Sequence, residues 1–177
     1  MDRYLFVIDY QNDFVDGALG FPGAEKLDAK IAAKVREYGK SHVLFTRDTH
    51  FENYLDTREG RNLPVKHCIK GTFGWEVYGE TAKGLAEVEA PGIDKLVFGM
   101  DVTDPATAAV LPESADEIEL VGLVSNICVV SNAVVLQSKY PEATITVDAS
   151  CTDSFDKSLH EKVLDVLAGF QVNVIGR

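Results

Sequence analysis

The alternation of short apolar runs with segments of helical periodicity constrains the fold most strongly. Near-continuous apolar character is typical of strands that are covered on both faces. The expected strands are residues 5–8, 42–46, 118–121 and 144–147, with weaker candidates at 95–98 and 172–175. The expected helices are residues 24–38, 81–87, 106–111, 129–139 and 158–169. This order predicts an α/β fold with a doubly wound, mostly parallel sheet and right-handed crossovers, although it does not give the strand order.

Length and composition predict one globular domain spanning residues 1–177. The chain has 177 residues, of which 46% are hydrophobic and 25% charged, and about 100–200 residues is the usual size of a domain. No apolar run approaches the roughly 18 residues that a membrane-spanning helix needs. The first residues lack the basic and apolar segments of a secretory signal. We therefore expect a cytoplasmic protein.

Charge and cysteine content narrow the classes of partner. A net charge of −11 makes nucleic acid and anionic membrane poor partners, because both reward clustered Lys and Arg. A small neutral or metal-assisted substrate fits better. The three cysteines are an odd number, which argues for a reducing compartment and against a disulfide framework.

Cys128 is a candidate nucleophile. It lies where a buried-type strand meets a polar, glycine-containing corner and a helix rich in Ala and Val begins. The free amides and the dipole at a helix N-terminus favour a thiolate and a nearby oxyanion. Asp9 ends the first expected strand and can serve as the base, since both positions open onto the same edge of a parallel sheet. Cys68 and Cys151 are interpreted as apolar filling.

A second set of polar residues predicts a metal site. Asp48 and His50 follow the second expected strand, and two residues apart in extended chain they point to the same side. His67 lies further along the irregular segment 49–80. This segment is longer than the loops that merely connect elements in a compact domain, so we expect it to carry function. Mixed nitrogen and oxygen ligands suit zinc, with iron and manganese as alternatives. The competing interpretation, a hydrogen-bonded pair that caps a loop, is weakened by the position of these residues in the same layer as Asp9 and Cys128.

Four ordered motifs resemble the signatures of the isochorismatase-like cysteine hydrolases, and among them most closely those of nicotinamidases. They are Val-Ile-Asp9-Tyr-Gln-Asn-Asp-Phe14, Thr-Arg-Asp48-Thr-His50, Leu-Pro-Val-Lys-His67-Cys-Ile-Lys-Gly-Thr72 and Gly122-Leu-Val-Ser-Asn-Ile-Cys128. The resemblance runs from about residue 3 to the C-terminus. It implies a three-layer, flavodoxin-like fold with a six-stranded sheet. It also implies hydrolysis of nicotinamide to nicotinate and ammonia. Family members are often oligomers, so a homo-oligomer is also expected.

The resemblance also implies roles for individual residues. Asp9 would take the thiol proton and later protonate the leaving amine, while Cys128 would attack the carboxamide and form a thioester. A non-proline cis peptide would lie at Val124-Ser125, with an oxyanion hole formed by backbone amides there and at Cys128. Glu59 would be a fourth metal ligand beside Asp48, His50 and His67. Candidates for the substrate pocket are Phe14, Leu19 and Trp75.

One expected residue has no counterpart in this alignment of motifs. Nicotinamidases carry a catalytic lysine at the end of the strand before that of the nucleophile. In the segment 94–105 its position falls on Met100 or Val102, and Lys95, at the start of the expected strand, is placed at the opposite edge of the sheet. The lysine is therefore predicted to be absent. The chain would be a slow or differently tuned amidase, or use Lys70 from the loop, or have lost hydrolysis.

Three functions follow from these observations. The first is a metal-assisted cysteine amidase that acts on nicotinamide or a related small carboxamide. The second is a non-catalytic or weakly active homologue that binds a small ligand or a metal, motivated by the missing lysine. The third is a sibling hydrolase with another substrate, such as an isochorismate-like enol ether or an N-carbamoyl compound, whose relatives often lack the metal ligands.

Overall fold

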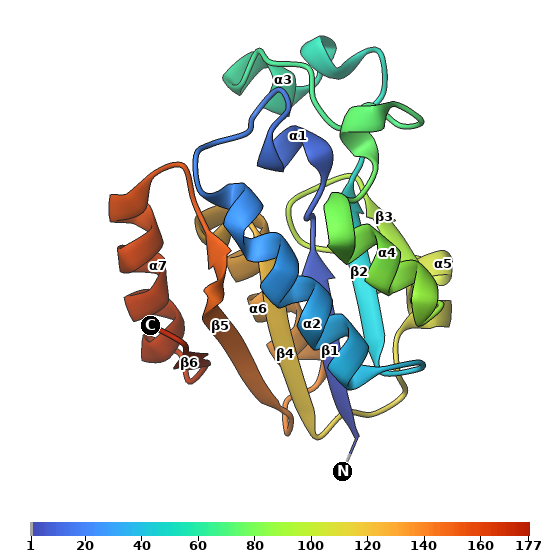
Figure 1. Ribbon diagram of the computed structural model, residues 1–177, viewed down its shortest axis with the longest axis vertical. Coiled ribbons are helices and arrows are strands. Elements are labelled where there is room, and N and C mark those ends of the chain that lie inside the picture. The colour runs from blue at the N-terminus through green and yellow to red at the C-terminus, as the bar shows by residue number, and fades with distance from the viewer. Residues whose placement is uncertain (1) are drawn as a thin grey trace.

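The computed structural model describes residues 2–177, in which strands and helices alternate along the chain (Figure 1). The strands are β1 (Arg3–Ile8), β2 (Val43–Asp48), β3 (Gly92–Lys95), β4 (Glu117–Leu123), β5 (Thr144–Asp153) and β6 (Asn173–Ile175). The α-helices are α1 (Asn12–Val15), α2 (Asp28–Tyr38), α3 (Arg58–Asn62), α4 (Gly79–Glu87), α5 (Pro105–Val110), α6 (Val130–Lys139) and α7 (Lys157–Gly169).

The described residues form a six-stranded sheet in the order β3-β2-β1-β4-β5-β6, with every neighbouring pair parallel. The chain begins in the middle of the sheet, winds outward to β3, and then returns to β4 on the other side of β1. The winding direction therefore reverses between β1 and β4. In doubly wound sheets a ligand crevice forms outside the carboxyl ends of the strands at this point. The predicted α/β fold is confirmed.

Two hydrophobic clusters define the layers on either side of the sheet. One joins alternate residues of β1 and β2 to α1, α2 and α4, and includes Leu5, Ile31, Val35 and Leu85. The other joins the opposite faces of the strands to α5, α6 and α7, and includes Phe6, Leu136 and Leu164. Both faces of the central strands are thus covered, which explains their continuous apolar sequences.

The third strand differs from the one expected at residues 95–98. β3 ends at Lys95, and the apolar residues that follow form an irregular segment in which the side chains of Leu96 and Val97 are 59% and 57% exposed. The run Leu-Val-Phe at 96–98 resembled a strand because it is apolar. However, the ladder to β2 is formed by the four residues before it, with Asp48 opposite Lys95 in the register.

Gly122 allows β1 and β4 to approach each other just before their carboxyl ends. Its φ is +110°, and a Cβ at this position would lie 2.0 Å from the carbonyl oxygen of Ile8. Only glycine adopts this conformation and tolerates this approach without strain. The glycine of the polar corner in the sequence is therefore required by the packing of the two central strands.

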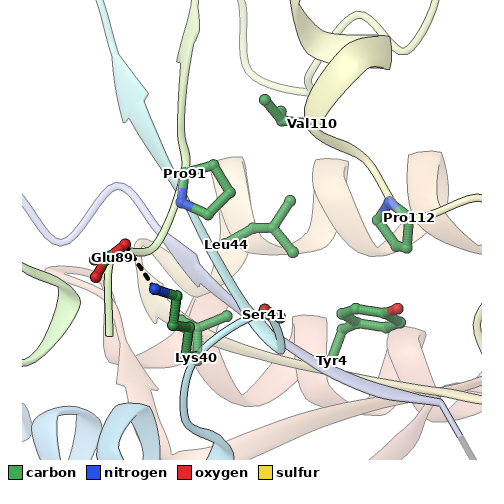
Figure 2. A pocket seen from close by; sticks show the side chains of 9 residues that line it. Tyr4, Lys40, Ser41, Leu44, Glu89, Pro91, Val110 and Pro112 are labelled. Atoms are coloured by element: carbon green, nitrogen blue, oxygen red, sulfur yellow. Dashed lines mark hydrogen bonds and ion pairs between the residues drawn. The ribbon is translucent and has the colours of Figure 1, made fainter. Parts of the chain in front are cut away.

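The amino ends of the strands carry a separate cavity of about 300 Å³ (Figure 2). Its wall includes Tyr4, Leu44 and Pro91, together with Lys40 and Glu89. The last two form an ion pair of 2.8 Å at the exposed rim, so the charges in this wall neutralise each other. The chemistry-bearing residues of the sequence lie at the other edge of the sheet.

No helix within residues 2–177 combines the length and the apolar character needed to cross a bilayer.

Candidate active site

The carboxyl ends of four strands bring the candidate catalytic residues together. Asp9 follows β1, Asp48 is the last residue of β2, Lys95 is the last residue of β3, and Cys128 follows β4. Because all four strands are parallel, these ends meet at one edge of the sheet. The topology alone therefore gathers a thiol, an amine and two carboxylates around the crevice between β1 and β4.

Cys128 lies in a π-helical turn, Ser125–Val129, that leads directly into α6. Its side chain is buried, and its carbonyl oxygen accepts a hydrogen bond of 2.8 Å from Nδ2 of Asn132. That amide also donates to the carbonyl oxygen of Phe98, at 3.1 Å. Asn132 therefore joins the turn that carries Cys128 to the segment that follows β3.

Lys95 completes the group at the centre of the site. Its Nζ lies 2.6 Å from Oδ2 of Asp9 and 3.5 Å from Sγ of Cys128. A third contact of 3.3 Å reaches Oδ1 of Asp48. The side chain is 1% exposed, so these interactions occur away from water. The prediction that a lysine is absent from this position was wrong, because β3 ends at Lys95 rather than beginning there.

The residues proposed in place of that lysine lie elsewhere. Met100 is buried in the cluster between the sheet and α6, and its amide donates to Oδ1 of Asn132 at 2.9 Å. Val102 packs against the same cluster. Lys70 is half exposed and forms an ion pair of 3.0 Å with Asp94. None of the three replaces Lys95.

Asp9 is held in an uncommon backbone conformation. Its φ of 44° lies in the left-handed region, which costs about 1–3 kcal/mol for a residue that has a Cβ. Thr46 of the neighbouring strand fixes it twice: its carbonyl oxygen accepts from the Asp9 amide at 3.2 Å, and its hydroxyl donates to Oδ1 at 2.6 Å. The other carboxylate oxygen, Oδ2, is thereby directed to Lys95.

Burial and mutual attraction set the charges of this group. Burial is the largest influence on Asp9 and raises the pKa of its carboxyl, although Lys95 opposes the shift. Burial also disfavours the charge of Lys95, but the attraction of Asp9 and Cys128 raises the pKa of the amine well above its ordinary value. Burial raises the pKa of the Cys128 thiol well above its ordinary value, although Lys95 opposes this shift. The resting group therefore holds a thiol, a protonated amine and a carboxyl that is more basic than usual.

A second polar group lies beside the first. One ligand atom from each of Asp48, His50, Glu59 and His67 can be chosen so that all four lie within 4.8 Å of one another. Glu59 comes from α3, whereas His67 comes from the loop between α3 and α4. These four are the residues that the sequence and the family resemblance proposed as metal ligands. Two imidazoles and two carboxylates form a donor set that suits a divalent ion such as zinc, iron or manganese.

Hydrogen bonds orient these donors before any ion binds. Nδ1 of His67 lies 2.8 Å from the carbonyl oxygen of Val65, which can only accept, so Nδ1 carries a proton and Nε2 is the nitrogen that faces Asp48 and Glu59. Nε2 of His50 lies 3.0 Å from Oδ2 of Asp48. Burial alone would raise the pKa of Asp48, but Lys95 and the two histidines lower it strongly. Asp48 is thus ionised and ready to act as a ligand.

A cavity of about 560 Å³ opens onto both polar groups. Cys128 lies in its wall together with Asp48, Glu59 and His67, while the rest of the wall is largely apolar. Phe14 and Leu19, two of the three residues proposed for the substrate pocket, line it. Phe98 and Phe155 also contribute to the wall, and neither was proposed from the sequence.

Trp75, the third proposed pocket residue, does not line this cavity. Its ring lies 3.7 Å beneath the guanidinium of Arg47, and its indole N–H donates to Oγ1 of Thr49 at 2.9 Å. Its carbonyl oxygen accepts from Nε2 of Gln11 at 2.8 Å. The indole needs a polar partner when it is buried, and it finds one at the end of β2. Trp75 therefore supports the strand that carries Asp48.

The cis peptide lies one bond earlier than expected, between Leu123 and Val124. The physical reason is the length of β4, which extends to Leu123, so that the bond directly follows the last residue of the strand. Of the residues proposed for the oxyanion hole, Val124 and Cys128 line the cavity. Ser125 is fully buried and does not line the cavity.

Comparison with known proteins identifies the family. The model of the isochorismatase domain matches residues 3–177. The chain therefore belongs to the isochorismatase-domain family.

Within this family, the chain is similar to several nicotinamidases and pyrazinamidases. The nicotinamidase of Saccharomyces cerevisiae (strain ATCC 204508 / S288c) is 23% identical over 217 residues, covering 99% of this chain and 100% of that one. The crystal structure of the nicotinamidase PncA from Bacillus subtilis has a TM-score of 0.84 at 25% identity and covers 99% of both chains. The pyrazinamidase of Pyrococcus horikoshii in complex with zinc shares the fold, with a TM-score of 0.82 at 20% identity and full coverage of both chains.

Proposed function

We propose that the protein is a metal-assisted cysteine amidase that hydrolyses nicotinamide, or a related small aromatic carboxamide, to the carboxylate and ammonia. The observation that carries the proposal is the contact of Lys95 with both Asp9 and Cys128, at 2.6 and 3.5 Å, where Cys128 lines a largely apolar cavity. The likeness to nicotinamidases supports the choice of substrate.

The acylation step follows from the contacts of Cys128. Its thiol transfers a proton to the carboxylate of Asp9, whose basicity burial increases. The positive charge of Lys95 stabilises the thiolate that forms. Sulfur then attacks the carboxamide carbon, and the electron pair of the carbonyl moves to oxygen. Backbone amides at Val124 and in the turn of Cys128 are the candidate donors to this oxyanion.

Collapse of the tetrahedral intermediate reverses the path of the proton. The carbonyl re-forms, the carbon–nitrogen bond breaks, and the carboxyl of Asp9 protonates the leaving nitrogen to give ammonia. A thioester to Cys128 remains. Asp9 then takes a proton from water as the water oxygen bonds to the thioester carbon. The carbon–sulfur bond breaks to release the acid, and the proton held by Asp9 returns to the sulfur and restores the thiol.

The divalent ion would be held by Asp48, His50, Glu59 and His67, and their mixed donor set fits this role. When bound, it supplies a Lewis acid at the cavity wall that can take the ring nitrogen of the substrate. A fixed ring places the carboxamide toward Cys128 in a single orientation, which lowers the entropy cost of attack. Zinc is the proposed ion, and the zinc complex of the P. horikoshii relative supports this choice.

The alternative of a non-catalytic homologue has lost its motivation, because Lys95 occupies the position that was expected to be empty. The sibling hydrolases that act on other substrates often lack the metal ligands, whereas four candidate ligand atoms gather here. A cytoplasmic location and a homo-oligomeric state remain predictions.

Ammonia release from nicotinamide and from pyrazinamide tests the proposal. The wild-type protein, purified with its metal content measured, is expected to turn over at least one of the two amides. Cys128→Ala should be inactive while it binds the same amount of metal. Folded, metal-loaded wild-type protein that releases no ammonia from either amide would contradict the proposal.

A further inference from the structure

One polar contact behind the turn of the nucleophile is not used by the proposed chemistry. Oγ of Ser125, the first residue of the turn, lies 2.9 Å from Nδ1 of His160. Ser125 is fully buried, and the side chain of His160 is 12% exposed. His160 belongs to α7, which packs against this turn. A serine hydroxyl both donates and accepts, so the bond forms with either tautomer of the imidazole.

We infer that His160 is a positioning residue that holds the oxyanion-binding turn in place through Ser125. The inference rests on the proposed thiol chemistry but not on the identity of the amide. Ser125 leads the turn, and the carbonyl oxygen of Val124, directly before it, accepts from the amides of Ile127 and Val129 at 3.1 and 3.2 Å. A displacement of Ser125 therefore moves the backbone that faces a developing oxyanion.

The start of the helix that carries His160 is held by side-chain hydrogen bonds to its backbone. This helix is capped by Asp156, whose Oδ1 accepts from the amide of Leu159 at 2.9 Å. Oδ1 of Asp153 lies 4.0 Å from Nδ1 and accepts from the amide of Ser154 at 2.7 Å. The imidazole is thus presented to Ser125 by a helix end whose own backbone is well bonded.

The Ser125, His160 and Asp153 arrangement is not a second hydrolytic triad. In such a triad the serine and the carboxylate bind opposite nitrogens of the imidazole, so that a proton can pass across the ring. Here both residues face Nδ1. Ser125 is also fully buried and does not line the cavity of Cys128. The role of the contact is therefore mechanical.

The thiol has supports of its own that do not involve α7. Sγ of Cys128 contacts Lys95, and its carbonyl oxygen is held by Asn132. Loss of the His160 contact should disturb the stabilisation of the oxyanion and leave the reactivity of the sulfur intact. This separates a positioning role from general damage to the site.

Two reactions of the same thiol distinguish these effects. Acylation by p-nitrophenyl acetate passes through a tetrahedral oxyanion and releases p-nitrophenolate. Alkylation by iodoacetamide displaces iodide at a saturated carbon and forms no oxyanion. Both rates are measured on the metal-loaded protein, with Cys128→Ala giving the background from the other cysteines. The ratio of acylation to alkylation then reports on the oxyanion site alone.

The matched variants are His160→Leu, Ser125→Ala, their combination, and His160→Asn, which keeps a polar atom near the position of Nδ1. We expect His160→Leu and Ser125→Ala each to lower the ratio about tenfold, less than the hundredfold or more that removal of an oxyanion donor costs. The double variant should also show about a tenfold loss rather than a hundredfold loss, because both changes remove one contact. His160→Asn should recover most of the ratio.

Two results would overturn the inference. One is a ratio that stays within about twofold of wild type in both single variants, well short of the loss expected for an oxyanion contact. The other is a parallel fall of acylation and alkylation, which indicates general loss of structure. Wild-type protein that is acylated normally but releases no ammonia from nicotinamide would contradict the proposed substrate, and the ratio would still decide the role of His160.

Discussion

At the scale of single residues, Lys95 determines the charge balance of the active site. Its ammonium lies between the carboxylates of Asp9 and Asp48 and contacts the sulfur of Cys128, with almost no exposure to water. In such surroundings a charge interacts far more strongly than at the surface. Lys95 thus touches both residues of the proposed catalytic pair, Asp9 and Cys128, and a candidate metal ligand.

Replacement of Lys95 is therefore expected to abolish most of the activity. Lys95→Met removes the charge that stabilises the thiolate, and we expect kcat/KM to fall by about 10²–10⁴, the range typical of lost acid–base assistance. Lys70→Met is the matched control, since Lys70 is half exposed and pairs with Asp94 outside the cavity. The measurement is ammonia release at saturating metal. Equal activity of the two variants would contradict the role of Lys95.

The candidate metal ligands give a prediction that does not depend on turnover. His67→Ala removes a buried donor whose tautomer is fixed by Val65, and the bound metal per chain, measured by mass spectrometry, should fall at least tenfold. Glu52→Gln is the control from the same segment between β2 and α4, because its carboxylate is exposed and pairs with Lys66. Full metal occupancy in His67→Ala would rule out the proposed site.

The sequence predicted most of these residues, and the exception has a structural reason. Asp9 and Cys128 follow strands that are long and continuously apolar, so the ends of those strands could be located. β3 has four residues and lies at the edge of the sheet, with Ile93 as its only fully apolar buried side chain. The exposed run 96–98 looked more like a strand than β3 did. The predicted strand therefore began at Lys95, whereas β3 ends there, and this one boundary decided at which edge of the sheet Lys95 was placed.

At the scale of elements, the approach of β1 to β4 sets the width of the crevice. Gly122→Ala would place a methyl group 2.0 Å from the carbonyl oxygen of Ile8, at a φ of +110°. We expect this change to lower the free energy of unfolding by about 3 kcal/mol or more, because neither strand can move without loss of its neighbours. Urea denaturation followed by circular dichroism measures the effect.

Gly169 provides the control for this substitution. It is the last residue of α7 and has no left-handed backbone, and within residues 2–177 no neighbouring atom lies within 4 Å of the place that an added methyl group would take. Gly169→Ala should leave the free energy of unfolding unchanged or raise it by up to about 1 kcal/mol, since alanine favours the helix. If both variants lost the same stability, the close approach at Gly122 would not be the cause.

The elements of the fold were largely predictable, but their arrangement was not. Helices such as α2 and α7 have clear periodicity, and the central strands are apolar because both faces are covered. The order of strands depends on which helix packs against which face, and this information is distributed over the whole chain. Phe98 and Phe155, which line the pocket, were not predicted. They belong to loops, and the position of these loops is determined only when the sheet is assembled.

At the scale of the whole molecule, a partly buried cation links one helix layer to the sheet. Nζ of Lys34, in α2, lies 2.6 Å from Oε1 of Glu119 in β4 and 2.9 Å from Oδ2 of Asp148 in β5. The hydroxyl of Tyr38 donates to the other oxygen of Glu119 at 2.7 Å. This network lies on the α2 side of the sheet, away from the cavity, so it affects stability without touching the chemistry.

The acid stability of the protein should depend on this network. Burial alone would raise the pKa of Asp148, but hydrogen bonds from Lys34 and Ser150 lower it below its ordinary value of 3.8. A carboxyl whose pKa is lowered by folding contributes stability that is present above the unfolded pKa and is lost as the pH falls through the folded pKa. Asp148→Asn should therefore cost about 2 kcal/mol of unfolding free energy at about pH 6, the range for a hydrogen bond to a charged group.

The same difference should shrink on acidification. Below the ordinary pKa of an aspartate the unfolded chain binds a proton that folded Asp148 still lacks, and at lower pH the folded carboxyl is protonated as well. Urea unfolding of both proteins at about pH 6 and about pH 3 measures this change. Asp165→Asn is the control: Asp165 pairs with Arg177 at the surface, and exposed pairs contribute about 0–1 kcal/mol. A difference between wild type and Asp148→Asn that stayed constant across this pH range would show that the carboxylate charge is not what Lys34 stabilises, and that the network acts through packing instead.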